Sequence, residues 1–560
     1  MAQVVRLWSG VRFSSTLSTK AKFSLSPKKS LSALKGRKTS IQPTTPVRTR
    51  FAPSPTGLLH LGSLRTALYN YLLAKSTGGQ FLLRLEDTDQ KRLVPGAEED
   101  IYSSLEWLGL KMDEGPPVGG PYGPYKQSVR SDIYQRYVEQ LISSGHAYKC
   151  YCSKDRLDAL RESASKLHPP SLASYDRKCA HNHRPEDTDR ITMDYKDQHY
   201  VVRFKSPDTY PAFIDLLHGS LNLQVQTNPT DIRYEDPVLM KSDGLPTYHF
   251  ANVIDDHLMK ITHVIRGEEW LPSTPKHIAL YNAFGWKAPE FVHIPLLTSI
   301  TDKKLSKRKG DTGVSAMKER GILPEALINF SALFGWSPRR DGSANANNTT
   351  GDVSKSEVYS LEELCKIFTL DGLTKGNAKV DDKKLHYFNK LYFSKRLDDP
   401  VHFEKILNKC YELAKRALFP SIPKGQEYRS DLNYTRKVLQ LAQTCGLEDV
   451  HEFTSKYGFL YVRPILQNEL DGPTQVIYVN CIKRCLNVLL NTSSNENVKE
   501  IIDIAVKSLT EDDIAKKKDI FGSLRYALAG GVSGVKIPVL IEFLGKNEVV
   551  QRLQTVVDKI

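Results

Sequence analysis

The clearest pattern of hydrophobic and polar positions lies near residue 50, where it predicts a strand, a loop, a helix and a second strand. Residues 47–52 are compatible with a β-strand, and residues 53–57 hold two prolines and a glycine. Apolar side chains then recur at helical spacing from Leu61 to Leu72, and a glycine pair at 78–79 precedes an apolar run at 80–85. This order predicts a βαβ unit of a parallel sheet and therefore an α/β fold.

The rest of the chain divides into an apolar, strand-bearing body and a helical end. Further strands are expected at 261–265 and 295–299. Residues 339–356 are polar and rich in Asn, Gly and Ser, which predicts a surface loop near a domain boundary. Beyond about residue 395 the pattern is mostly helical.

Length and composition limit the class of protein. A chain of 560 residues suggests three or four domains, and 40% hydrophobic with 25% charged residues excludes a mostly disordered protein. No stretch approaches the ~20 apolar residues needed to span a bilayer, so no membrane insertion is expected. Eight cysteines are too few for a disulfide scaffold and indicate a reducing compartment.

The net charge of +14 is concentrated at the start of the chain. The first acidic residue is Glu86, whereas nine basic residues precede Arg48 in a serine-rich segment. An apolar helical face is formed there by Val4, Leu7, Trp8 and Val11. This composition predicts a mitochondrial transit peptide at 1–47; a basic arm that binds RNA is the alternative. Without this segment the charge is only +5, so any nucleic acid must be bound by local basic patches.

Residues 50–57, followed by His60 and Gly62, form the first candidate for chemistry. They lie at the carboxyl end of a strand and the start of a helix, where α/β sheets bind ligands and helix N–H groups attract phosphate. Gly62 would let a ligand approach the backbone, and His60 could donate to phosphate oxygens. A lone histidine at a helix start is more often a cap or packing residue, so the preceding octapeptide carries the interpretation.

A basic loop at 302–310 forms the second candidate. Five of the seven residues from Lys303 to Lys309 are basic. Such a loop can follow the charge that develops on a phosphate chain, although a solvated turn is the simpler interpretation. The chain has no Walker A motif, which excludes a P-loop.

Together these two stretches resemble the paired nucleotide motifs of class I aminoacyl-tRNA synthetases. The segments 50–57, 85–89, 95–99, 248–257 and 265–270 are similar to glutamyl-tRNA synthetases of the bacterial and organellar type. The resemblance is strong over 48–335 and continues faintly at 521–525 and 544–546. Leu61, Ser63, Leu305 and Arg308 depart from the general class I motifs, but resemble members of this specificity.

The resemblance implies a Rossmann-like parallel-sheet catalytic domain with an inserted acceptor-binding domain, followed by an all-α anticodon-binding region. We expect the transit peptide at 1–47, the two catalytic halves at 48–149 and 236–335, and the insertion at 150–235. A linking domain is expected at 336–395 and the helical anticodon-binding region at 396–560.

The resemblance also implies the site residues. The catalytic residues are His60, Lys304 and Lys307. The glutamate-binding residues are Arg50, Phe51, Ala52, Ser54, Glu86, Tyr248, His249, Asn252 and Arg266. The ATP-binding residues are His60, Gly62, Glu269, Lys304, Leu305, Ser306, Lys307 and Arg308.

These assignments make chemical sense for a glutamate site. Guanidinium groups at Arg50 and Arg266 would bind the side-chain carboxylate with paired hydrogen bonds, and Glu86 would accept from the ammonium group. A structural ion pair is the alternative role for Arg50 and Glu86. The uncharged amide of glutamine would match a buried arginine poorly.

One cysteine cluster suggests a structural zinc ion. Cys150, Cys152, Cys179 and His181 follow the pattern Cys-x-Cys and Cys-x-His, which could supply a tetrahedral site. Some bacterial family members resemble this arrangement and others lack the ligands. His183 is a rival for the fourth position, and four unliganded side chains are the alternative.

The expected function is the ligation of L-glutamate to the 3′ end of mitochondrial tRNA(Glu) through a glutamyl-adenylate, with ATP and Mg²⁺. The enzyme is expected to act as a monomer in the mitochondrial matrix. Whether tRNA(Gln) is charged as well is left open. Rival functions are a short paralogue that glutamylates a tRNA base, a glutaminyl enzyme and a non-catalytic RNA-binding factor. The length of the chain argues against the short paralogue, and Arg266 argues against the glutaminyl enzyme. The intact nucleotide motifs argue against the non-catalytic factor.

Overall fold

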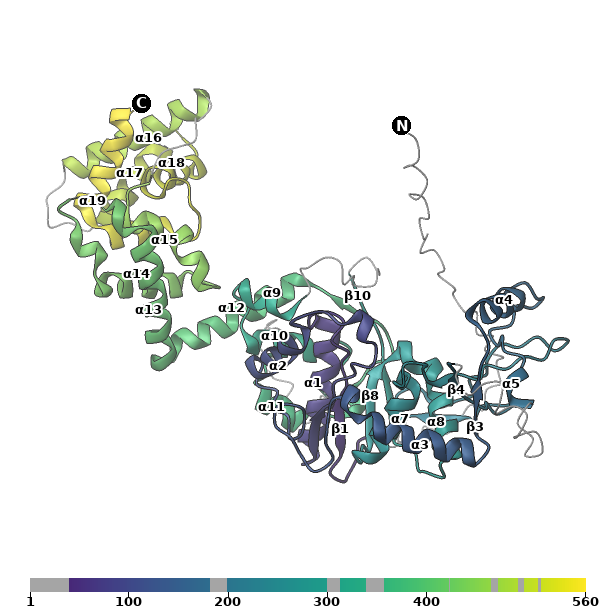
Figure 1. The fold of residues 1–560 in the computed structure, drawn as a ribbon. Helices are drawn as coiled ribbons and strands as arrows, with labels where there is room; N and C mark the ends of the chain where they lie inside the picture. Colours follow the sequence, from purple (N-terminus) through teal and green to yellow (C-terminus); the bar gives the residue numbers. More distant parts are fainter. Residues whose placement is uncertain are drawn as a thin grey trace, which may run out of the picture. The chain divides into compact units, whose positions relative to one another are not determined.

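The computed structural model describes residues 40–181, 199–299, 313–338, 357–422, 424–464, 472–491, 498–511 and 515–559 (Figure 1). All described residues except Ser40 belong to one compact unit, Ile41–Ile560. Most of the predicted transit peptide, the basic loop at 302–310 and the polar loop at 339–356 lie outside the described residues.

The predicted βαβ unit is confirmed. Strands β1 (Arg48–Phe51) and β2 (Gln80–Leu83) pair in parallel, and helix α1 (Leu61–Ser76) connects them and packs on β1 (Figure 1). Leu64, Leu68 and Leu72 of the predicted helical face are fully buried. A side chain at position 79 would collide with the backbone of Val47, because its Cβ would lie 1.9 Å from the Val47 carbonyl oxygen. Gly79, the second glycine of the pair that follows the helix, thus permits the first strand to approach.

A second sheet carries the other half of the catalytic body. Its strand order is β6 (Gly219–Leu221), β5 (Phe213–Asp215), β9 (Glu290–Ile294) and β8 (His263–Gly267). Strands β5 and β8 run parallel to β9, and β6 runs antiparallel to β5. The strand expected at 261–265 is β8, which begins two residues later. The strand expected at 295–299 is the shorter β10 (Leu297–Ser299), which pairs with β11 (Ala378–Val380).

The expected insertion at 150–235 does not separate cleanly from this sheet. Its strands β5 and β6 belong to the catalytic sheet, because Asp215 in β5 pairs with Phe291 in β9 and accepts a hydrogen bond from the backbone N–H of His293. Strands β3 (Ala147–Cys150), β4 (Val201–Phe204) and β7 (Val238–Met240) form a separate antiparallel sheet, of which only β4 lies wholly within the expected bounds. Helices α4 (Lys154–Ser165) and α5 (Lys178–His181) accompany it.

Within the described residues, seven further α-helices belong to the body and its link. They are α2 (Ala97–Trp107), α3 (Ser131–Ser143), α7 (Tyr248–Leu258), α8 (Thr274–Ala283), α9 (Val314–Glu319), α10 (Pro324–Ala332) and α11 (Leu361–Ile367). α7 packs against α8, and α10 packs against α1.

The region beyond residue 395 is helical, as expected, and the described residues there contain no strand. Its helices are α12 (Asp382–Asp398), α13 (Pro400–Ala417), α14 (Leu432–Thr444), α15 (Phe453–Tyr461), α16 (Gly472–Leu490), α17 (Val498–Glu511), α18 (Lys517–Ala529) and α19 (Ile537–Lys559). Helices α16 to α19 contact one another around a shared apolar core. Across the described ranges, no helix is both long and apolar enough to cross a bilayer.

Candidate active site

A cavity of about 890 Å³ opens where the carboxyl ends of β1 and β8 meet the start of α1. Of the residues predicted for the site, it is lined by Arg50, Phe51, Ala52, Ser54, His60, Gly62, Glu86, Tyr248, Asn252, Arg266 and Glu269. His249 is not among the lining residues. Lys304, Leu305, Ser306, Lys307 and Arg308 lie outside the described residues. The first motif and the predicted amino-acid site therefore share one cavity.

His60 is the N-cap of α1. Its Nδ1 accepts a hydrogen bond from the backbone N–H of Ser63 at 3.2 Å, which places the proton of a neutral ring on Nε2. Gly62 lies against this ring, and a Cβ there would come within 3.2 Å of it. In this tautomer Nε2 lies 3.1 Å from the Ser63 hydroxyl, so His60 caps the helix and both of its ring nitrogens contact Ser63.

Arg50 is anchored from behind by α7. Its Nε lies 3.0 Å from Oδ1 of Asp256, and the same oxygen accepts from Arg84 at 2.5 Å. Burial alone would raise the pKa of Asp256, but the charges of Arg50 and Arg84 lower it below its ordinary value. Asp256 is thus held ionised between two guanidinium groups.

Glu86 sits in the same network, on the cavity side. Its carboxylate lies 3.0 Å from Arg84, and the residue is 7% exposed. Burial raises the pKa of Glu86 above its ordinary value, against the opposing influence of Arg84 and Arg50. A ligand cation beside it would favour the charged form.

The charges of this buried network balance. Three guanidinium groups face three carboxylates: Arg50, Arg84 and Arg130 against Glu86, Asp255 and Asp256. With the amide oxygen and nitrogen of Asn252 assigned to match their neighbours, its nitrogen donates to Asp256 at 3.2 Å and its oxygen accepts from Arg84 at 3.0 Å. Among the described contacts there is no ion pair between Arg50 and Glu86, the alternative role considered for them; Arg50 pairs with Asp256 and Glu86 with Arg84.

Arg266 differs from this network. It is 4% exposed, and no carboxylate of the described residues lies within ion-pair distance. Its guanidinium donates to the hydroxyls of Tyr248 at 3.2 Å and Thr274 at 2.8 Å. It also donates to two histidine rings behind it. Trp270 packs on Tyr248 with ring centroids 4.2 Å apart. Arg266 therefore resembles the buried Arg65 of the cavity lining: neither has a carboxylate at ion-pair distance among the described residues.

Several residues at the site were not predicted from the sequence. Arg84 and Asp256 are charged residues inside buried stretches. Because an isolated buried charge is costly, such positions indicate that each residue has a partner of opposite charge. His277 and His293 gave no such signal, since neutral histidines are common in cores. Lys241 also lines the cavity without any local motif to mark it.

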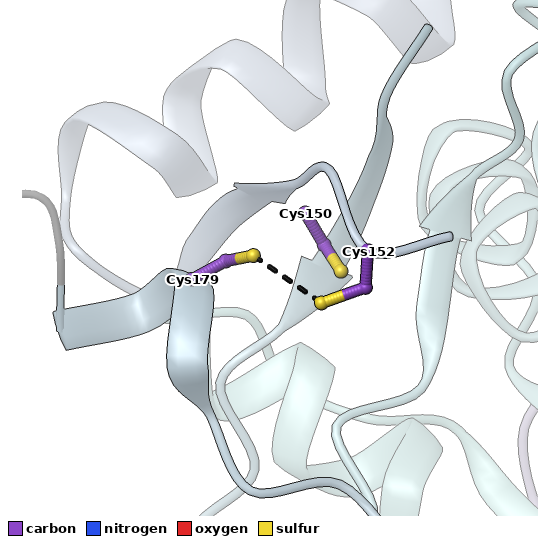
Figure 2. Close-up of side chains that lie close together, drawn as sticks. All are labelled: Cys150, Cys152 and Cys179. Atoms are coloured by element: carbon purple, nitrogen blue, oxygen red, sulfur yellow. Dashed lines mark hydrogen bonds between the residues drawn. The ribbon is translucent and has the colours of Figure 1, made fainter. Parts of the chain in front are cut away.

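The cysteine cluster lies apart from the cavity, in the antiparallel sheet region. The thiol sulfurs of Cys150, Cys152 and Cys179 all lie within 4.8 Å of one another, and those of Cys152 and Cys179 are 3.6 Å apart (Figure 2). The hydroxyl of Tyr175 lies 3.3 Å from the Cys150 sulfur. His181 ends α5, and its side chain is outside the described part.

Comparison with known proteins matches this architecture. Residues 46–387 match the family described as tRNA synthetases class I (E and Q), catalytic domain, and residues 409–557 match an anticodon binding domain. The chain is 50% identical to the mitochondrial glutamate–tRNA ligase of Saccharomyces cerevisiae, over 94% of both chains. It is 41% identical to that of Schizosaccharomyces pombe, over 91% of both.

Solved structures agree with the sequence comparison. A crystal structure of a glutamate tRNA ligase from Elizabethkingia meningosepticum, in complex with its amino acid, superposes with a TM-score of 0.71 at 35% identity. The match covers 92% of this chain and 99% of the other. The fold and cavity are those of a class I aminoacyl-tRNA synthetase. Within that class, the chain belongs to the glutamate–tRNA ligase family.

Proposed function

We propose that this synthetase ligates L-glutamate to the 3′ end of mitochondrial tRNA(Glu) in two steps, using ATP. The observation that carries the proposal is the pair of arginines, Arg50 and Arg266, in one cavity with Glu86. Glutamate carries two carboxylates and one ammonium group, so its net charge of −1 offsets the unpaired charge of Arg266. Glutamine has no such net charge.

Glutamate is bound by charge and hydrogen bonding. Arg50 and Arg266 take the side-chain carboxylate, and Glu86 accepts from the ammonium group. Ser54, Tyr248 and Asn252 supply neutral hydrogen bonds, while Phe51 and Ala52 border the strand end. His249 contributes indirectly, through the histidine chain described below.

The first step joins glutamate to AMP. The α-carboxylate oxygen attacks the α-phosphorus of ATP, and pyrophosphate leaves in line. His60, Lys304 and Lys307 stabilise the charge that develops on the phosphates, and Mg²⁺ bound to ATP neutralises part of it. Gly62, Glu269, Leu305, Ser306 and Arg308 complete the ATP site.

The second step transfers the glutamyl group to tRNA. The 2′-hydroxyl oxygen of the terminal adenosine attacks the carbonyl carbon of the adenylate, the bond from that carbon to the phosphate oxygen breaks, and the hydroxyl proton passes to the departing AMP. No nucleophile of the protein is required. Positioning by the site supplies much of the acceleration.

We also propose that Cys150, Cys152, Cys179 and His181 bind a structural zinc ion. Tetrahedral coordination with Zn–S bonds of about 2.3 Å separates the sulfurs by about 3.8 Å. The 3.6 Å between Cys152 and Cys179 fits that geometry. The ion would join α5 to β3 and takes no part in the two chemical steps.

The organisation and location of the protein complete the proposal. A transit peptide at 1–47 directs the chain to the mitochondrial matrix, where the enzyme acts as a monomer. The catalytic halves at 48–149 and 236–335 flank the insertion at 150–235, whose strands β5 and β6 join the catalytic sheet. The linking domain at 336–395 then precedes an anticodon-binding region at 396–560. The two relatives named mitochondrial support the location.

A charging assay tests the function. Purified protein is incubated with labelled glutamate, ATP and magnesium, with or without mitochondrial tRNA, and acid-precipitable label is counted. Label on tRNA only when ATP is present is the expected result, and labelled glutamine in place of glutamate is the control. If tRNA acquires no glutamate, the proposed function is wrong. Purified tRNA(Gln), assayed in parallel, shows whether that tRNA is also a substrate.

A further inference from the structure

Five side chains form one continuous hydrogen-bonded chain behind the cavity. His249 Nδ1 lies 3.0 Å from His277 Nε2, and His277 Nδ1 lies 3.1 Å from Arg266 Nη1. On the other side, Arg266 Nε lies 3.0 Å from His293 Nε2, and His293 Nδ1 lies 2.7 Å from Asp215 Oδ2. The members come from five elements, α7, α8, β8, β9 and β5.

The direction of every hydrogen bond in this chain follows from the arginine. A guanidinium has only donors, so His277 Nδ1 and His293 Nε2 must both accept. The proton of His293 therefore sits on Nδ1 and is donated to Asp215, while that of His277 sits on Nε2 and is donated to His249. A second proton on either ring would oppose an arginine N–H. Burial also lowers the pKa of His293 to about 4 and that of His277 well below its ordinary value.

The two pocket arginines are consequently held in different ways. Arg50 rests on the carboxylate of Asp256, whereas Arg266 rests on uncharged imidazoles. The carboxylate of Asp215 is one ring further away and is already occupied by backbone N–H groups of Leu217, His218 and His293. The imidazoles thus satisfy the buried guanidinium without offsetting its charge.

We propose that His277 and His293 are positioning residues that set amino-acid specificity, because their neutral nitrogens hold Arg266 with its charge free for the side-chain carboxylate of the substrate. Asp215 fixes the tautomer of His293. The inference rests on the proposed function, since it takes glutamate as the substrate. An amide side chain gains little from an unpaired charge, so the same arrangement disfavours glutamine.

Two substitutions of similar shape separate charge from packing. His277→Gln keeps a neutral acceptor, whereas His277→Glu places a carboxylate against Arg266. The charged and titratable groups that face His277 are Arg266, His249, Lys276 and Arg50, and the three cations among them favour an ionised glutamate there. KM and kcat for glutamate and glutamine are measured in the charging assay.

The two variants should behave differently. His277→Gln should raise the KM for glutamate about threefold at most. His277→Glu should raise it about thirtyfold, or about 2 kcal/mol at 1.4 kcal/mol for each factor of ten. The preference for glutamate over glutamine should fall by about tenfold or more in His277→Glu alone, with the KM for ATP unchanged. Equal losses in both variants would reduce His277 to a packing residue and overturn the proposal.

Further variants guard against misfolding and against failure of the proposed function. If His277→Glu gives no folded protein, the Asp215→Asn variant tests the proposal instead. The amide of the new asparagine favours the other tautomer of His293, so the KM for glutamate should rise about fivefold or more. An unchanged KM would overturn the proposal. His218→Gln is the matched control, because the His218 side chain bonds to the backbone carbonyl of His293 and not to its ring. Parent protein that charges no glutamate refutes the function itself; normal charging by both the parent and His277→Glu refutes only this inference.

Discussion

Arg50 and Asp256 form a buried ion pair, with side chains 3% and 1% exposed and an Nε–Oδ1 distance of 3.0 Å. The two residues are 206 positions apart. The arginine belongs to the motif at the end of β1, and the aspartate to α7 in the other half of the body. The orientation of the Arg50 side chain is therefore fixed by α7, a helix outside the motif that contains Arg50.

Replacing that aspartate should destabilise the body of the protein. Asp256→Asn leaves Arg50 and Arg84 buried without their shared counter-charge, and breaking a buried pair typically costs about 3–5 kcal/mol. We expect a clearly lower midpoint in urea or thermal unfolding. Asp158→Asn removes only an exposed pair with Arg161 and should change stability by less than about 1 kcal/mol. Similar midpoints for both variants would contradict the role of Asp256.

Removing the charge of Glu86 should weaken glutamate binding specifically. Glu86→Gln cannot pair with the substrate ammonium, and a hydrogen bond to a charged group is worth about 1.5–3 kcal/mol. The KM for glutamate should thus rise about tenfold or more, with the KM for ATP unchanged in the charging assay. Glu98→Gln, which breaks a contact with Lys126 away from the cavity lining, serves as the control. An equal rise for both substrates would indicate a general structural defect instead.

The second basic motif should act on the rate rather than on the fold. Lys307→Ala removes a charge proposed to follow the phosphates, and loss of one transition-state donor typically slows turnover about 10²–10³-fold. The rate of glutamylation should fall accordingly, with an unchanged unfolding midpoint. Lys318→Ala, an exposed lysine over the Trp107 ring, should retain the parent rate. Near-normal turnover in Lys307→Ala would remove the loop from the mechanism.

The cysteine cluster should hold about one zinc ion per chain. Metal analysis of protein purified in chelator-free buffer measures this directly, and Cys152→Ser should lose most of the metal because structural zinc needs its four ligands. Cys445→Ser keeps its zinc, since Cys445 lies outside the cluster. A stoichiometry near zero in the parent protein would refute the site.

The helical region should carry an acid-sensitive ion cluster around Glu548. Its carboxylate lies 2.8 Å from Arg552, 3.1 Å from Arg463 and 3.0 Å from Arg429. Burial alone would raise the pKa of Glu548, but hydrogen bonds from Arg463 and Arg552 lower it to about 2. The folded pKa is below the unfolded value of about 4.3, so the stabilisation is complete above that pH and is lost as the pH falls toward 2.

The Glu548→Gln variant tests this pH dependence. The difference in unfolding free energy between parent and variant should be largest near pH 6 and should shrink as the pH falls below about 4. Urea unfolding at several pH values measures it, with Glu511→Gln as the control because that residue is exposed. A difference that is constant with pH would contradict the assigned ion cluster.

Local features of the protein were predictable from the sequence. The βαβ unit follows from periodicity and a glycine pair, and the helical end from its apolar spacing. The motifs around Arg50, His60 and Arg266 identified the family because each occupies a short, continuous stretch. These features depend on neighbours only a few residues away, which a sequence displays directly.

The long-range partners of these residues were decided by the tertiary structure alone. The sequence placed Asp215 in an insertion, yet β5 joins the catalytic sheet and brings its carboxylate to His293, 78 positions away. Likewise, nothing near Arg266 indicates that neutral rings rather than carboxylates would surround it. Periodicity records which face of an element is buried, but the counter-charge that meets a buried arginine depends on which elements pair across the sheet.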